Sequence, residues 1–278
     1  MTSDSSSSGV TCTKVEGIAR VVFDSPPINL MTLEMFVATA RLISELAEDD
    51  EVRVVILSSA LPDFFIAHFD VEAILTFPTD QEPATELNLF HVMCEKLRTM
   101  SKATIAVVEG RIGGGGSELA LSCDMRFASR GDSKRTGAIF NQPEVALGII
   151  PGGSGTQRLS RLMGRSRALE VILGCDDVDA ETAERWGWVN RALPSSEIGP
   201  FVDRLARRIA SFPPHAVAAA KAAVIRAEKD VPDDLLAEGN AFSATLGHAE
   251  SRQAMETFLA RGGQTLAGES RLAELFDV

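Results

Sequence analysis

The least ordinary stretch of the sequence is a run of glycines that leads into an acidic residue. Residues 110–118 read Gly-Arg-Ile-Gly-Gly-Gly-Gly-Ser-Glu and follow the apolar run 104–108, which we expect to be a buried strand. A helix is expected to open near Ser117. Backbone N–H groups at such a turn can be aimed at an anion, or at a carbonyl oxygen that gains charge during a reaction. The residues alone support equally a structural interpretation, in which the glycines only allow the helix to pack closely on the strand.

Two known phosphate-binding patterns fit this glycine run poorly. A P-loop requires Gly-Lys-Ser/Thr after four intervening residues, and no lysine follows the glycines here. A dinucleotide-binding fingerprint requires an early strand-helix-strand unit and an acidic residue about 20 positions further on. Asp124 comes too soon for that pattern, and the run lies far along the chain. The oxyanion and packing interpretations therefore remain.

Two other segments place reactive residues at junctions between expected elements. Residues 64–71 follow the short apolar run 54–57 after a turn at Pro62, so they lie at another strand-to-helix junction. Glu144 comes directly after a proline in a largely apolar segment. Burial there would raise the pKa of its carboxyl group toward a value useful for proton transfer. The competing interpretation is an exposed loop glutamate.

Together these segments resemble the enoyl-CoA hydratase/isomerase (crotonase) superfamily, and the resemblance covers nearly the whole chain. The family's first motif, Phe-x-Ala-Gly-Ala-Asp-Leu/Ile, stands here as residues 65–71, Phe-Ile-Ala-His-Phe-Asp-Val. Its second, Gly-x-Ala-x-Gly-Gly-Gly-Cys-Glu-Leu-Ala-Leu-x-Cys-Asp, stands as residues 110–124, with Glu118 in the glutamate position. Its third, Gln-Pro-Glu-x-x-x-Gly-x-x-Pro-Gly-x-Gly-Gly-Thr-Gln-Arg-Leu, stands as residues 142–159, with Glu144 in place.

The resemblance implies a site and a role for each of its residues. The backbone N–H groups of Ala67 and Gly115 would form an oxyanion hole that holds the thioester carbonyl and stabilises the enolate. Glu118 would help to activate a water for attack at C3, and Glu144 would deliver the proton to C2. The other residues expected to contact the substrate are His68, Phe69, Asp70 and Gly114. No metal and no dissociable cofactor is expected, because CoA arrives as part of an acyl-CoA thioester substrate.

The chain departs from the family pattern in three places. His68 replaces a glycine and Phe69 a small alanine, which brings bulk next to the first oxyanion donor. We interpret His68 as packing at the CoA mouth or as a third polar group facing the acyl chain, and Phe69 as reshaping the acyl pocket. The stretch between Glu118 and Glu144 is longer than in a typical hydratase, and residues 129–137 are expected to form an exposed excursion there.

The activity implied by the resemblance is syn addition of water to a trans-2-enoyl-CoA, which gives a 3-hydroxyacyl-CoA. One alternative on the same enolate chemistry is Δ3-Δ2 enoyl-CoA isomerisation, for which one well-placed glutamate suffices, or another reaction of this family. An alternative from a different class is a catalytically silent member that only binds CoA thioesters. The family also implies a homo-oligomer, either a trimer or a hexamer.

The elements that position these residues indicate an α/β protein. Alternating strands and helices require crossover connections, and the resemblance implies a spiral of ββα units. We divide the chain into a disordered lead-in (1–10), a spiral core with the active site (11–200) and a C-terminal helical trimerisation region (201–278), broken at 211–214. The expected elements are a hairpin over 11–24 with its turn at Glu16-Gly17, helices over 32–48 and 84–100, and buried strands over 54–57 and 104–108.

Composition limits the partners. The 278 residues carry a net charge of −12 and are 45% hydrophobic, so the chain can bury a large core and repels phosphate backbones, which argues against nucleic-acid binding. The four cysteines form no CxxC pair, which indicates neither a zinc site nor a redox site and suits a reducing cytoplasm. The Ser-rich N-terminus resembles no targeting signal, and no apolar run reaches the ~20 residues of a membrane span.

Overall fold

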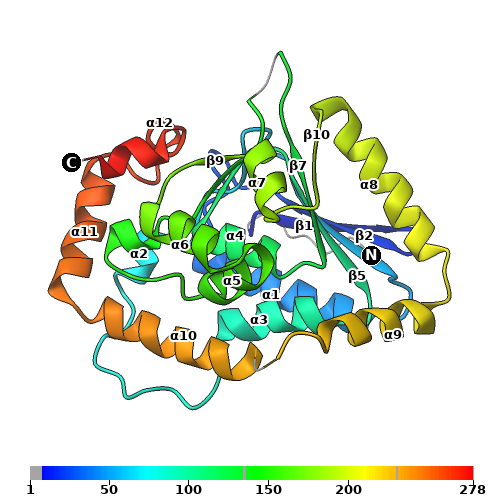
Figure 1. Ribbon diagram of the computed structural model, residues 1–278, viewed down its shortest axis with the longest axis horizontal. Coiled ribbons are helices and arrows are strands. Elements are labelled where there is room, and N and C mark those ends of the chain that lie inside the picture. The colour runs from blue at the N-terminus through cyan, green and yellow to red at the C-terminus, as the bar shows by residue number, and fades with distance from the viewer. Residues whose placement is uncertain (1–7, 134–135, 230, 278) are drawn as a thin grey trace.

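The computed structural model describes residues 8–133, 136–229 and 231–277, and two β-sheets form its centre (Figure 1). Neighbouring strands of the larger sheet run parallel, except for the antiparallel hairpin at its edge. In spatial order, the larger sheet contains β1 (Val10–Val15), β2 (Ile18–Phe23), β3 (Val54–Ser59), β5 (Ala103–Val108), β7 (Met125–Ser129) and β10 (Arg191–Leu193).

A smaller sheet lies next to the larger one. In order it contains β4 (Phe64–Ile66), β6 (Arg111–Gly113), β8 (Ile139–Asn141) and β9 (Val178–Asp179), of which only the last pairs antiparallel. Each strand of the larger sheet from β3 to β7 leads into a strand of the smaller one and then into a helix. These helices are α2 (Val71–Ile74), α4 (Gly114–Leu121) and the 3-10 helix η1 (Glu144–Leu147). This repetition confirms the expected spiral of ββα units.

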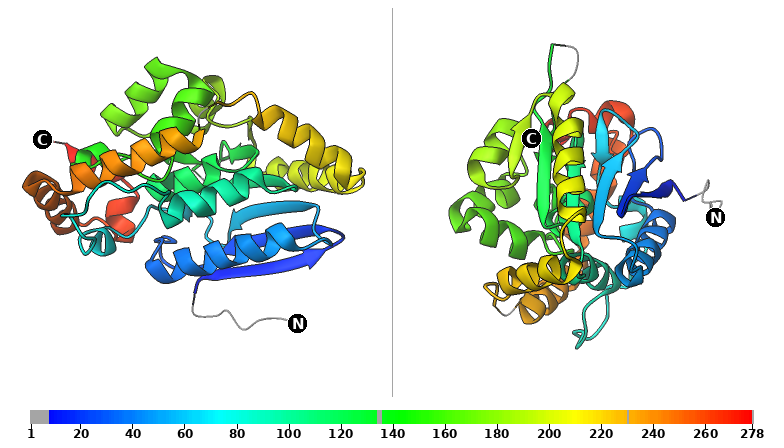
Figure 2. Two further views of the ribbon diagram at one scale, coloured as in Figure 1. Left: turned by 90° about the horizontal axis from the view of Figure 1, so that it is seen from below. Right: turned by 90° about the vertical axis from the view of Figure 1, so that its right-hand side faces the viewer.

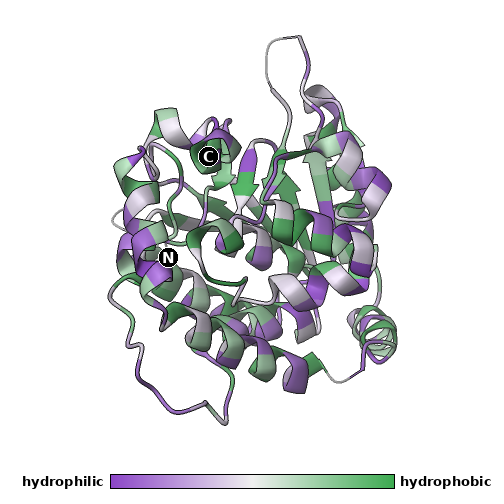
Figure 3. Ribbon diagram, turned by 60° about the vertical axis from the view of Figure 1, so that its left-hand side comes forward, coloured by the Kyte–Doolittle hydropathy of each residue, from purple (hydrophilic) through white to green (hydrophobic). Residues whose placement is uncertain are grey.

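Helices cover the sheets on their outer faces. Helix α1 (Leu33–Glu48) begins at Thr32, whose hydroxyl accepts a hydrogen bond from the Met35 N–H at 3.2 Å and so caps the helix. Its apolar side packs in one cluster with that of α3 (Leu89–Thr99). Figure 2 shows these helices beside the strands, and Figure 3 shows that apolar residues concentrate on the interior strands. All six residues of β5 are buried, as expected for a strand covered on both faces.

The rest of the chain is largely helical. Figure 1 shows α8 to α12 running around the periphery of the molecule, from one end of the large sheet to the region of α2. None of the helices among the described residues is long and apolar enough to cross a membrane. The remaining elements are α5 (Gly155–Met163), α6 (Arg165–Gly174), α7 (Ala180–Trp186), α8 (Ser195–Ala210), α9 (Pro214–Ile225), α10 (Val231–Leu246), α11 (Ala249–Ala260), α12 (Leu266–Glu269) and η2 (Leu272–Phe276).

The expected hairpin is confirmed, with its turn at Glu16 and Gly17, but two of the expected boundaries are wrong. Val10, assigned to the lead-in, is 4% exposed and pairs with Phe23 in β1, because its side chain joins the core. Residues 1–7 lie outside the described part of the chain. The boundary between 200 and 201 cuts through α8, which packs against the large sheet with Val202 and its neighbours.

Two helix starts also differ from expectation. The helix expected from residue 84 begins at Leu89, because the Asn88 side chain accepts the His91 N–H at 2.8 Å and caps it there. The helix expected near Ser117 begins three residues earlier, at Gly114. The break expected at 211–214 is confirmed, since α8 ends at Ala210 and α9 begins at Pro214.

Candidate active site

The three motif segments meet at one edge of the smaller sheet. Its strands β4, β6 and β8 are parallel, with Ile66 opposite Ile112 and Ile112 opposite Phe140. The segments that follow these strands therefore leave the sheet at the same edge. Ligands of parallel sheets bind at the carboxyl ends of the strands, which is where these segments lie.

The glycine run lets these segments approach closely. Gly114 has a positive φ of +44°, and a Cβ placed on it would lie 3.1 Å from both the His68 Cβ and the Glu144 Oε1. A Cβ on Gly116 would lie 2.6 Å from the Ile66 carbonyl oxygen. A side chain on Gly116 would collide with the backbone, and one on Gly114 would be strained. The glycines thus allow the close packing of α4, which brings His68 and Glu144 to its start, and the oxyanion interpretation remains a prediction.

Glu118 is buried inside this junction. Its side chain points from α4 to the turn before α5, where Oε1 accepts hydrogen bonds from the N–H groups of Gly153 and Gly155, both at 2.8 Å. Burial raises the pKa of Glu118 well above its ordinary value, and the neighbouring Glu144 carboxyl adds to this rise. The two N–H donors act in the opposite direction, since they stabilise the ionised form.

Glu144 is the second buried carboxyl group. Its Oε1 accepts a hydrogen bond from the Gln142 Nε2 at 3.0 Å. Its Oε2 is buried and has no hydrogen-bond partner within the described part of the chain. Burial raises the pKa of Glu144 to about 7, against the opposing effects of the Gln142 amide and the His68 ring. A carboxyl group with this pKa is suited to donate and accept a proton at neutral pH.

The two carboxyl groups both lie close to the Gln142 amide. A Cβ placed on Gly155 would lie 3.0 Å from the Glu118 Oε1 and 3.1 Å from the Gln142 Nε2, which itself donates to Glu144. The longer connection between the two glutamates does not disturb this arrangement. It projects from the body of the molecule in Figure 1, and its described residues Asp132 and Ser133 are exposed.

The Ala67 N–H, which we expected to be the first oxyanion donor, already has an acceptor in the structure. The Ala67 N–H donates to the Ile28 carbonyl at 3.2 Å, so it is not available to a thioester. The Phe69 N–H has no acceptor among the residues that the structure describes, and this nitrogen lies 3.6 Å from the position of a Cβ on Gly115. Gly115 lies in the first turn of α4, where backbone N–H groups have no partner within the helix. Phe69 and Gly115 are therefore the facing pair.

Asp70 and the Phe69 ring, also in the first motif, make contacts of different kinds. The Asp70 carboxylate accepts the Glu72 N–H at 3.0 Å and caps α2, so its role in the structure is that of a helix cap. The Phe69 ring belongs to an aromatic cluster with Phe36, Phe77 and Phe90, at centroid distances of 6.1, 6.2 and 6.2 Å.

His68 is 4% exposed and bonded through both ring nitrogens. Its Nδ1 lies 2.7 Å from the Phe69 carbonyl oxygen, and its Nε2 lies 3.0 Å from the Glu269 Oε1. These contacts show that His68 is packed within the protein, and its two expected positions, at the CoA mouth or facing the acyl chain, stay predictions. Glu269 comes from α12, so the C-terminal segment reaches the site.

Sequence reasoning missed three residues of this site. Gln142 stood in the third motif but was not singled out, whereas Glu238 and Glu269 lie in C-terminal helices without any local signal. Glu238 accepts hydrogen bonds from the Ser154 N–H and the Thr156 hydroxyl, and so holds the turn that donates to Glu118. Its Oε1 also lies 3.2 Å from the His91 Nε2, which ties α10 to α3.

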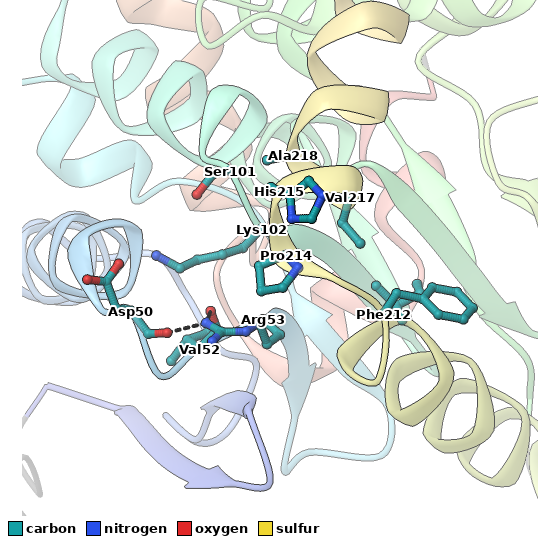
Figure 4. A pocket seen from close by; sticks show the side chains of 11 residues that line it. Asp50, Val52, Arg53, Ser101, Lys102, Phe212, Pro214, His215, Val217 and Ala218 are labelled. Carbon is teal, nitrogen blue, oxygen red and sulfur yellow. Dashed lines mark hydrogen bonds between the residues drawn. The ribbon is translucent and has the colours of Figure 1, made fainter.

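A cavity of about 230 Å³ lies elsewhere, at the amino ends of strands β3 and β5 of the large sheet (Figure 4). Its walls come from the residues just before β3 and β5 and from the junction of α8 with α9. It is far from the motif segments in the fold, since it adjoins the amino ends of the strands. Its lining includes Asp50, Arg53, Lys102, Phe212 and His215.

Comparisons with known proteins identify the family of this chain. The family model for enoyl-CoA hydratase/isomerase matches residues 13–266. The chain is 34% identical over 247 residues to the short-chain-enoyl-CoA hydratase of Clostridium acetobutylicum, which covers 88% of this chain and 92% of that protein. It is 31% identical over 252 residues to the crotonyl-CoA hydratase of Syntrophomonas wolfei, with coverage of 88% and 93%. A solved structure from Streptomyces avermitilis, named as a candidate enoyl-CoA hydratase, matches with a TM-score of 0.86 at 38% identity and covers 96% of this chain and 97% of its own. This chain therefore belongs to the enoyl-CoA hydratase/isomerase family.

Proposed function

We propose that this chain is an enoyl-CoA hydratase, which adds water to a trans-2-enoyl-CoA and forms a 3-hydroxyacyl-CoA. The observation that carries this proposal is the pair of buried carboxyl groups, Glu118 and Glu144, close to the Gln142 amide. One member of such a pair can accept a proton while the other donates one. The names of two relatives, a short-chain-enoyl-CoA hydratase and a crotonyl-CoA hydratase, support the same reaction.

The two carboxyl groups differ in their hydrogen-bond donors. Burial raises the pKa of both groups, and that of Glu118 is raised further by Glu144, so the pair retains a proton near neutral pH. The N–H groups of Gly153 and Gly155 oppose the rise in the pKa of Glu118 but do not cancel it. Because only Glu118 accepts two backbone N–H groups, we assign it as the proton acceptor and Glu144 as the proton donor, the roles that the family resemblance implies.

The hydration reaction starts from a protonated Glu144 and an ionised Glu118. The thioester carbonyl accepts hydrogen bonds from the Phe69 and Gly115 N–H groups, which stabilise the negative charge that develops on its oxygen. Glu118 takes a proton from water as the water oxygen bonds to C3, and the electrons of the double bond move into an enolate. The carbonyl re-forms as C2 takes the proton of Glu144. Both carboxyl groups act from one side, which gives syn addition, and transfer of a proton from Glu118 to Glu144 restores the starting state.

The aromatic cluster favours a short acyl group. A Cβ on Gly115 would lie 3.3 Å from the Phe69 Cβ and 3.6 Å from the Phe90 Cζ, so these side chains fill the space beside the proposed oxyanion donors. The Phe90 ring also stacks on Phe36 with centroids 5.8 Å apart. A four-carbon thioester such as crotonyl-CoA is therefore the first substrate to test.

Turnover of crotonyl-CoA, followed as loss of the enoyl-thioester absorbance, tests the proposal. Hydration adds one water to the product mass, whereas isomerisation leaves the mass unchanged. We expect hydration by the unaltered protein and its loss in both Glu118→Ala and Glu144→Ala. Binding of the thioester without any turnover would instead identify a silent family member. Unchanged turnover in either variant would remove that residue from the mechanism.

We also propose that the chain forms a homo-oligomer, a trimer or a hexamer, and acts in the cytoplasm. Helix α9 supports the first proposal, because none of its twelve described residues is buried and Val224 is 73% exposed. The four free cysteines support a reducing compartment. Light scattering coupled to size-exclusion chromatography gives the assembly mass, and a monomer mass would contradict the oligomer.

A further inference from the structure

His68 stands where the family motif has glycine, and its two ring nitrogens face acceptors. The Phe69 carbonyl oxygen, 2.7 Å from Nδ1, can only accept, so Nδ1 carries a hydrogen. The Glu269 Oε1, 3.0 Å from Nε2, belongs to a carboxyl group that is fully buried. An ionised Glu269 likewise only accepts, and Nε2 then carries a hydrogen too. This arrangement is that of an imidazolium paired with a carboxylate.

A second donor on Glu269 supports its ionised state. The Gln264 N–H donates to the same Oε1 at 2.7 Å. A neutral pair would require that this oxygen also carry the shared proton. Burial is the largest influence on the pKa of Glu269 and raises it, but the His68 charge and hydrogen bond, the Gln264 N–H and Arg111 together bring the pKa below its ordinary value. Burial is likewise the largest influence on the pKa of His68 and lowers it, but Glu269, the Phe69 carbonyl and Glu144 together bring the pKa above its ordinary value.

The side chains of His68 and Glu144 both border Gly114. A Cβ placed on Gly114 would lie 3.1 Å from the His68 Cβ and 3.1 Å from the Glu144 Oε1. A positive charge on His68 stabilises the ionised form of Glu144, and by the same interaction Glu144 stabilises the imidazolium.

Few other charged groups face this pair. The charge of Arg111 on β6 lowers the pKa of Glu269, but its guanidinium group is bound by the Asp177 carboxylate, with both contacts at 2.7 Å. From α11 the neighbour of the imidazole is the Phe258 ring, edge-on at a centroid distance of 5.8 Å, which carries no charge. The charged neighbours of His68 are therefore Glu269 from α12 and Glu144 from η1.

We propose that His68 and Glu269 form a buried ion pair that fixes α12 as a wall of the active site and places a positive charge beside the Glu144 carboxyl group. Both are positioning residues, and this role rests on the proposed function only in so far as Glu144 is the proton donor. Burial alone would hold a proton on Glu144 too firmly for release. The adjacent imidazolium offsets this effect, so that Glu144 can give up and regain a proton in each turnover.

Nuclear magnetic resonance of the histidine rings tests the pair without any turnover. The chain has only four histidines, and the spectrum of His68→Gln identifies the His68 signals. In the unaltered protein, ring nitrogen shifts should show an imidazolium at neutral pH. In Glu269→Gln, and to a smaller extent in Glu144→Gln, the midpoint of the His68 titration should move to lower pH. Glu274→Gln, an exposed change in the same C-terminal segment, should leave the midpoint in place.

The outcomes separate this proposal from the proposed function. A neutral His68 ring in the unaltered protein at neutral pH would overturn the ion pair. An unchanged midpoint in Glu144→Gln would overturn the interaction with Glu144, and this comparison remains available if Glu269→Gln does not fold. Absence of crotonyl-CoA hydration would contradict the proposed function, but it would leave both results on His68 standing.

Discussion

Glu238 of α10 accepts a hydrogen bond from the Ser154 N–H, which lies between the two amides that donate to Glu118. Ser154 has a positive φ of 100°, a conformation that non-glycine residues seldom adopt. The contacts from Glu238 thus hold an unfavourable turn in the shape that Glu118 requires. Figure 2 shows α10 alongside α3, and the His91 Nε2 of α3 lies 3.2 Å from the same Glu238 oxygen, Oε1.

We expect Glu238→Ala to lower both stability and hydration. Buried donors left without an acceptor cost about 1–3 kcal/mol each, which corresponds to roughly 2–4 °C in Tm per kcal/mol for a chain of this size. The turn before α5 would relax, and Glu118 would lose its two N–H donors. Thermal unfolding and kcat for crotonyl-CoA measure the two effects. Glu250→Gln, an exposed change on α11, is the control, and equal values in both variants would contradict this role of Glu238.

Replacing Glu118 or Glu144 should lower kcat and leave thioester binding intact, whereas replacing Glu238 should lower stability as well as kcat. Replacement of Glu118 or Glu144 by glutamine preserves shape but removes a proton acceptor or donor. We expect kcat to fall by about 10²–10⁴, with affinity for the CoA thioester retained because the oxyanion donors are backbone groups. Calorimetric titration with 3-hydroxybutyryl-CoA gives the affinity. Loss of binding and kcat in parallel would indicate a structural role instead.

The rate of hydration should fall as the pH rises through the pKa of Glu144. Burial raises this pKa to about 7, and the proton donor is lost above it. In the reverse reaction the same group must accept a proton, so dehydration should slow as the pH falls. His68→Gln removes a positive charge that lowers the pKa of Glu144, so the alkaline limb for hydration should move to higher pH.

The control for His68→Gln is His215→Gln, because His215 is exposed and lines the cavity shown in Figure 4. It should leave the pH profile of hydration unaltered. A profile of His68→Gln that moves to lower pH, or does not move, would show that the ring places no positive charge on Glu144.

The parts of the site that short motifs encode could be predicted from the sequence. Glu118, Glu144 and the glycines each stand in a short motif at the junction of a strand and a helix, so the sequence shows them directly, although their spatial partners come from other motifs. Glu269 could not be predicted, because it meets a residue 201 positions away through a helix with no unusual composition. Glu238 likewise reaches across 147 positions to His91.

The oxyanion donor shows a finer limit of sequence reasoning. A motif gives the order of residues but not the direction in which each N–H points. The pairing of Ala67 with the Ile28 carbonyl decides this, and it leaves the Phe69 N–H facing the start of α4. The boundary at 200 has a related difficulty, since composition does not show that α8 continues across it and packs on the large sheet.

Gly114 should tolerate no side chain. Its φ of +44° makes any larger residue strained by about 1–3 kcal/mol, and a Cβ would press on Glu144 and His68. We therefore expect Gly114→Ala to lower Tm and to reduce kcat more than KM changes. Gly199→Ala is the matched control, because no atom lies within 4 Å of its added Cβ in α8. It should raise stability by about 0.5–1 kcal/mol without a change in activity.

Phe90 should set the length of acyl chain that the site accepts. Its ring lies against Gly115 and against the turn at Gly153, where a Cβ would come within 2.6 Å of Phe90 Cε1. Phe90→Ala removes the ring but no polar group of the site. The ratio of kcat/KM for octenoyl-CoA to that for crotonyl-CoA should therefore rise, by about 10-fold or more if two methylenes gain burial at ~0.8 kcal/mol each.

Phe212→Ala makes the same change at the 44% exposed ring beside the far cavity and controls for nonspecific loosening of the core. It should leave the ratio of the two substrates unchanged. A rise in the ratio confined to Phe90→Ala would mean that the aromatic cluster ends the acyl pocket. A fall in activity on both substrates with a constant ratio would mean that the ring supports the turn at Gly153, and that chain length is limited elsewhere.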